Sequence, residues 1–150
     1  MVWGIFLSVY TFYLVVYMLK LNQPSRYYSF MSPIQYMKHY TNLVPFQSFQ
    51  NYIMLFWEDR IKFSDIIRNI VGNFILFAPL GFVLPSIFPK IRSIKDTILV
   101  TFLVSIFFEI SQLILQIGSF DIDDCIIRIV GTIMGYGIYQ IASITLKKKG

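Results

Sequence analysis

Four long apolar segments constrain this chain more than any other feature. Each is long enough to cross the ~30 Å hydrocarbon core of a bilayer as a helix, and they cover residues 1–20, 66–88, 97–117 and 122–146. Only 14% of the residues are charged, whereas a soluble domain has about a quarter. We therefore predict an all-α membrane protein, a single domain over residues 1–150 that forms a bundle of about four transmembrane helices.

The first apolar segment lacks the features of a removed signal peptide. It has no basic start, and no small-residue cleavage pattern precedes the polar stretch that follows. We expect it to be a retained helix. The next stretch, 21–65, is polar overall but crowded with aromatic side chains such as Tyr52, Phe56 and Trp57. This composition predicts an aromatic segment in the membrane interface between the first two helices, with a re-entrant path as the alternative.

Basic residues predict the topology. Lys90, Arg92 and Lys95 lie between the second and third segments, and Lys147–Lys149 lie near the end of the chain. Both regions are expected in the cytoplasm, which places the N-terminus there too and makes this a multi-pass protein of the cell membrane. Further basic residues in 21–65 count against this prediction, although long loops follow the rule less strictly. Because the basic residues are dispersed, we expect contact with anionic lipid rather than nucleic acid.

Polar residues inside the apolar segments gather near one membrane surface. With the predicted topology they occupy the outer ends of the second, third and fourth helices, and polar groups buried in a membrane mark functional sites. The candidate ligand-binding residues are Asn69, Asn73, Glu109, Gln112, Asp121, Asp124 and Arg128. The sequence predicts no cofactor, and the single cysteine, Cys125, excludes an internal disulfide.

Structural interpretations of these residues stay open beside the functional one. Asp121 suits a helix N-cap, and Asp123 and Asp124 complement the positive end of a helix dipole. Arg128 can pair with Asp124 one turn away or form a buried bridge to Glu109. In the same helix Gly131 and Gly135 form a small-xxx-small stripe, which packs against the second or third helix or against a second copy of the chain.

Four motifs in order resemble a known family of membrane proteins. They are Asn42-Leu-Val-Pro-Phe46, Asn73-Phe-Ile-Leu-Phe-Ala-Pro-Leu-Gly81, Phe108-Glu-Ile-Ser-Gln112, and Ile117-Gly-Ser-Phe-Asp-Ile-Asp-Asp124 followed by Gly131 and Gly135. Over 42–139 the chain resembles the VanZ-like family, whose founding member confers low-level resistance to the glycopeptide teicoplanin. The resemblance adds Asn42 to the candidate site. Arg128 departs from the family pattern, which has asparagine there.

Three functions are compatible with this resemblance. The first is a non-enzymatic protein that lowers susceptibility to teicoplanin by binding a membrane lipid or a lipid-linked cell-wall precursor at the outer leaflet. The second is an intramembrane enzyme that uses paired carboxylates, alone or with a divalent cation, on a lipid-linked envelope precursor. The third is an accessory helix bundle that docks on another membrane protein or forms a homodimer. No nucleophile–histidine–acid order or phosphate-binding loop favours the enzyme.

Overall fold

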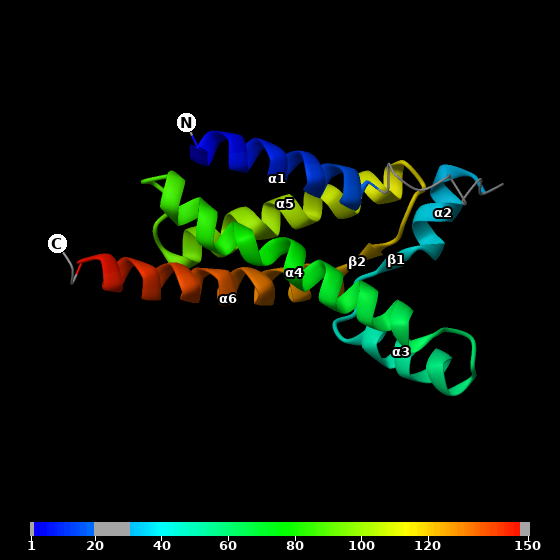
Figure 1. Cartoon of the computed structure of the whole chain (residues 1–150). Helices are drawn as coiled ribbons and strands as arrows, with labels where there is room; N and C mark the ends of the chain where they lie inside the picture. Colours follow the sequence, from blue (N-terminus) through cyan, green and yellow to red (C-terminus); the bar gives the residue numbers. More distant parts are fainter. Residues whose placement is uncertain (1, 20–30, 148–150) are drawn as a thin grey trace.

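Four long helices form the body of the protein in the computed structural model, which describes residues 2–19 and 31–147. They are α1 (Val2–Met18), α4 (Phe63–Ile87), α5 (Ile94–Ile114) and α6 (Ile122–Lys147), and Figure 1 shows them running lengthwise. By length and composition α4, α5 and α6 can cross a membrane, while α1 is a shorter apolar helix. The predicted all-α bundle of about four helices is confirmed.

Two helices start earlier than the predicted apolar segments, because their first turns contain charged residues. The helix α4 starts at 63 rather than 66, and α5 covers 94–114 rather than 97–117. At the start of α5 the hydroxyl of Ser93 accepts the backbone N–H of Asp96 at 3.1 Å. This N-cap fixes the helix start ahead of the apolar run, because capping depends on hydrogen bonds rather than on hydropathy.

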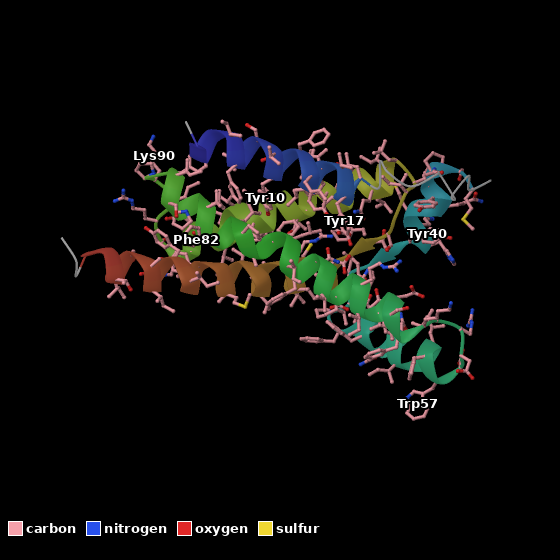
Figure 2. All side chains as sticks on the ribbon, in the orientation of Figure 1. Tyr10, Tyr17, Tyr40, Trp57, Phe82 and Lys90 are labelled. Atoms are coloured by element: carbon pink, nitrogen blue, oxygen red, sulfur yellow. The ribbon has the colours of Figure 1, made fainter. Side chains whose placement is uncertain are left out.

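The two ends of the bundle differ in what they carry. The N-terminus, the C-terminus and the α4–α5 turn with Lys90 lie at one end, here called the terminal end (Figures 1 and 2). The opposite end, here called the bridge end, carries α2 (Pro33–His39), α3 (Gln47–Trp57) and two short strands. The basic residues at positions 20, 26, 148 and 149 lie outside the described residues.

The two short strands join the segment after α1 to the start of α6. Strand β1 (Thr41–Asn42) pairs in parallel with β2 (Phe120–Asp121), with Thr41 opposite Phe120 and Asn42 opposite Asp121. The backbone N–H of Phe120 also donates to the Tyr40 carbonyl at 2.8 Å. Residues 79 positions apart, Asn42 and Asp121, are thereby held side by side.

Glycines bring α6 against α4. A Cβ atom at Gly131 would collide with the Phe74 carbonyl oxygen, and one at Gly135 would collide with the Ala78 carbonyl oxygen. Only a residue without a side chain permits this backbone approach. The small-residue stripe of α6 therefore packs on the second long helix of its own chain.

Candidate functional site

A buried ion pair lies at the centre of the bridge end. The Arg128 Nη2 atom of α6 is 2.7 Å from the Glu109 Oε1 atom of α5, and the two side chains are 1% and 0% exposed. Asp124, one turn before Arg128, is a second and weaker partner at 3.6 Å. Both pairings that the sequence suggested for Arg128 are present in the structure.

The remaining donors of Arg128 are also directed at the protein. Its Nε–H donates to the side-chain oxygen of Asn73 at 2.9 Å, and its Nη1–H donates to the Ser105 carbonyl at 3.5 Å. The guanidinium carbon lies 5.3 Å from the centre of the Phe77 ring, within the range of a cation–π contact. Arg128 thus joins α4, α5 and α6 at one point.

Glu109 connects this ion pair to the strands. Its second carboxylate oxygen accepts the backbone N–H of Asp121 at 2.7 Å. The Asp121 carboxylate in turn accepts three hydrogen bonds, from the Asn42 amide at 3.1 Å, from the Ser48 hydroxyl, and from the backbone N–H of Asp123 at 3.0 Å. The bond to Asp123 is the N-cap bond predicted for Asp121. Asn42, Glu109 and Asp121 therefore bond to the protein itself.

Asp123 has a role that the sequence analysis missed. Its carboxylate, 1% exposed, accepts the backbone N–H of Phe46 at 2.6 Å and that of Ser48 at 2.9 Å. These groups belong to the first turn of α3, whose own N-cap residue, Phe46, has no capping side chain and a left-handed φ of 68°. Asp123 caps α3 from another helix. Two sequence features could have indicated this role. The start of α6 has more acidic residues than its own cap needs, and the Leu-Val-Pro-Phe stretch before α3 has no side chain that could cap that helix.

Gln112 holds the end of α1. Its amide donates to the Met18 carbonyl at 2.6 Å, and the side chain is 7% exposed. Carbonyl groups in the last turn of a helix have no partner within the helix, so an amide from α5 satisfies one of them. Asn69 of α4 differs, since its side-chain oxygen is buried and accepts no hydrogen bond among the described residues.

A polar cavity of about 400 Å³ opens beside Arg128. Five of the eight predicted site residues contribute to its lining, and the other three, Asn42, Glu109 and Asp121, do not. The lining comprises Tyr17, Met18, Asp65, Arg68, Asn69, Asn73, Gln112, Ser119, Asp124 and Arg128. Asp65 and Arg68 were missed as site residues. The spacing of three and four residues that joins them to Asn69 and Asn73 on one face of α4 could have revealed them.

An apolar groove of about 290 Å³ separates α3 from the start of α4. Aromatic and aliphatic side chains line it, namely Phe49, Tyr52, Ile53, Phe56, Trp57, Phe63, Ile66 and Ile70. Figure 2 places Trp57 at the tip of this helical hairpin, where it is 81% exposed. Burial, and then the negative charges of Asp124, Asp121 and Asp123, raise the pKa of Tyr52, so its hydroxyl stays neutral.

Among residues 2–19 and 31–147, no group of three or more histidine, cysteine or acidic side chains has the arrangement of a metal site. The four carboxylates at the bridge end instead accept hydrogen bonds or ion pairs from nitrogen and hydroxyl donors of the protein. Their partners include backbone groups of α3, β2 and α6 as well as Arg128. What the site offers chemically is a polar cavity with a set of fixed charges next to an apolar groove.

Comparison with known proteins identifies relatives over most of the chain. A sequence model of the family described as VanZ/LLP1 matches residues 5–143. Protein VanZ from Enterococcus faecium is 30% identical over 122 residues, which are 81% of this chain and 66% of that protein. The chain thus spans about two thirds of the length of this curated relative. No solved structure matches the chain.

Proposed function

The chain belongs to the VanZ/LLP1 family, and from that premise we propose that it binds a membrane lipid or a lipid-linked headgroup at the outer leaflet and so lowers susceptibility to teicoplanin. The effect requires no catalysis. A protein that occupies or sequesters lipid headgroups hinders an acylated glycopeptide from anchoring its acyl chain or from reaching its lipid-linked target.

One observation carries this proposal: the polar cavity and the apolar groove are both lined by residues of α4. Asn69 and Asn73 line the polar cavity, and Ile66 and Ile70 line the apolar groove. These pairs form neighbouring stripes on the same two turns, about 60° apart around the helix axis. A ligand with a polar head and an acyl chain has the matching division, because its head is solvated by polar groups and its chain is not.

The proposal places the bridge end at the outer surface and the terminal end in the cytoplasm. The basic residues of the α4–α5 turn support this orientation, because cytoplasmic loops are enriched in lysine and arginine. Single cysteines in a Cys125→Ala background test it. A cysteine replacing Glu58 should react with a membrane-impermeant maleimide in intact cells, and one replacing Lys90 only after permeabilisation. The reverse pattern would invert the orientation.

The function itself is tested by drug tolerance. We would express the chain in a susceptible Gram-positive host and measure the minimum inhibitory concentrations of teicoplanin and vancomycin. A severalfold rise is expected for teicoplanin, with little change for vancomycin. Glu109→Gln and Asp124→Asn should abolish the rise at equal membrane levels.

Asp96→Asn is the matched control, because Asp96 is an exposed acid at the terminal end. It removes the same charge away from the site, so it should keep the tolerance. Unchanged tolerance in the Glu109 and Asp124 variants would refute a role for the polar cluster. No rise with the unmodified protein would refute the proposed function.

A further inference from the structure

We propose that the ligand group entering the polar cavity is a protonated amine, and that the site therefore selects amine-bearing headgroups over anionic ones. This inference rests on the proposed function and deepens it by naming the ligand chemistry. It follows from three features of the cavity, which are the hydrogen bonds that Arg128 already makes, the unused acceptor of Asn69 and the balance of fixed charge.

Arg128 is not available to bind a phosphate. All three of its nitrogen atoms are directed at protein acceptors, at 2.7 Å for Glu109, 2.9 Å for Asn73 and 3.5 Å for Ser105, and the side chain is 1% exposed. A phosphate could take these donors only by leaving Glu109 buried without a cation. Because an unpaired buried charge is strongly unfavourable, we assign Arg128 a positioning role in the wall of the cavity.

The cavity offers one acceptor that the protein does not satisfy. The Asn69 side-chain oxygen is buried without a hydrogen-bond partner among the described residues, which is costly unless a ligand or water donates to it. Asp124 lies in the same lining with its side chain 16% exposed, a long contact of 3.6 Å to Arg128 and a hydrogen bond with the Asn73 side chain, so it remains open to a cation on its exposed side. An ammonium group carries three N–H donors and a positive charge, and so fits an amide oxygen beside a carboxylate.

The fixed charge around the inner cavity favours a cation. Two carboxylates, those of Glu109 and Asp124, contact a single guanidinium, that of Arg128, and two more, those of Asp121 and Asp123, lie at the start of the same helix. Asp121 and Asp123 accept hydrogen bonds from neutral donors, which orient the carboxylates without cancelling their charge. An anion placed here would meet like charge at close range, and a cation would relieve it.

The mouth of the cavity fits the other half of a zwitterionic headgroup. Arg68 and Asp65 are both exposed on the first turns of α4 and contribute to the cavity lining. A phosphate that stays at this level can meet the Arg68 guanidinium while its amine extends inward to Asp124 and Asn69. Ammonium chemistry is common to aminophospholipids and to soluble amines, and the experiment below separates these two sources.

The first measurement uses the unmodified full chain, purified in an uncharged detergent. Isothermal titration calorimetry would compare dihexanoyl phosphatidylethanolamine, phosphatidylglycerol and phosphatidylcholine, with free ethanolamine as the soluble amine. We expect phosphatidylethanolamine to bind about tenfold more tightly than phosphatidylglycerol, the effect of one charge-assisted hydrogen bond. Phosphatidylcholine should also bind less tightly than phosphatidylethanolamine, because its quaternary nitrogen has no N–H donor.

Either source of the amine would be recognised in these titrations. Ethanolamine binding as tightly as the lipid would assign the site to a soluble amine, and much weaker ethanolamine binding would assign it to a lipid. Phosphatidylglycerol binding as tightly as phosphatidylethanolamine overturns the inference. This comparison needs no variant, so it holds even if a substitution prevents folding.

Variants then locate the recognition. Asp124→Asn should remove the preference for phosphatidylethanolamine, and Asp96→Asn, an equal change of charge at the terminal end, should keep it. A preference that persists in Asp124→Asn overturns the assignment to this cavity. Lipid binding without headgroup preference, together with teicoplanin tolerance, would refute the amine inference and leave the proposed function intact. Loss of both lipid binding and tolerance would refute the proposed function as well.

Discussion

The interface between α4 and α6 is held together by different means at its two ends. Toward the terminal end, Gly135 contacts the α4 backbone, and the hydroxyl of Thr132 donates to the Phe77 carbonyl at 3.1 Å. Toward the bridge end, the same helices meet through Arg128 and Asn73 at 2.9 Å. The glycine contact needs no charge, whereas the cost of desolvating a buried ion pair can exceed the attraction between its two charges. We interpret the charged end as the functional one for that reason.

The largest expected effect is on the glycine contact. Gly135→Ala places a Cβ atom against the Ala78 carbonyl oxygen and should destabilise the bundle by about 4 kcal/mol or more. Gly137→Ala is the matched control, because nothing lies within 4 Å of a Cβ atom there. Unfolding in sodium dodecyl sulfate, followed by circular dichroism, measures both. Equal stability of the two variants would contradict the close approach of α4 and α6.

The next largest effect concerns the buried ion pair. Arg128→Leu leaves Glu109 buried without its cation, which should cost about 3–5 kcal/mol of unfolding free energy. The double variant Glu109→Leu/Arg128→Leu removes both charges and should recover most of that loss. Unfolding titrations of the wild type, both single variants and the double variant give the coupling energy. A double variant as unstable as the sum of the two single variants would mean that the pair is not coupled.

A smaller and local effect is expected at the cap of α3. Asp123→Asn removes one of the two acceptors that hold the backbone N–H groups of Phe46 and Ser48, at a cost of about 1 kcal/mol. In a Trp3→Phe background, the fluorescence of Trp57 reports on α3 and should shift. Asp96→Asn serves as the control. An unchanged spectrum would mean that another group orients α3.

The smallest effect is predicted where a buried hydroxyl has no partner. The Ser105 Oγ atom is buried without a hydrogen bond among the described residues, so Ser105→Ala removes a desolvated group that gains nothing in return. Stability should change by less than about 0.5 kcal/mol or increase slightly. A large loss in the same unfolding assay would reveal an unrecognised partner of this hydroxyl.

Short-range patterns in the sequence predicted the helices and one long-range contact. The apolar segments give the helices because only helices satisfy their backbone groups within a membrane. The bridge between Glu109 and Arg128 could be anticipated, because a carboxylate inside a membrane helix needs a partner and Arg128 lies at the matching depth. In both cases a single physical requirement, the pairing of backbone groups or of a buried charge, leaves few possible structures.

Contacts that depend on register were beyond sequence reasoning. The capping of α3 by Asp123 requires Asn42 to lie opposite Asp121, and strands of two residues leave no periodic signal. The Gln112 bond to Met18 depends on where α1 ends relative to α5. Likewise Gly131 and Gly135 indicate a close approach of helices but carry no information on which helix approaches.

The length of α1 has a consequence for the surrounding bilayer. With 17 residues this helix is about 25 Å long, some 5 Å shorter than the hydrocarbon core of a typical membrane. Its end lies at the polar cavity, where Tyr17 and Met18 contribute to the lining. Where an apolar helix in the membrane is shorter than the hydrocarbon core, local thinning of the lipid is one accommodation, and beside α1 it would bring the headgroup layer toward the cavity. Hydrophobic mismatch would then bring headgroups to the site without any movement of the protein.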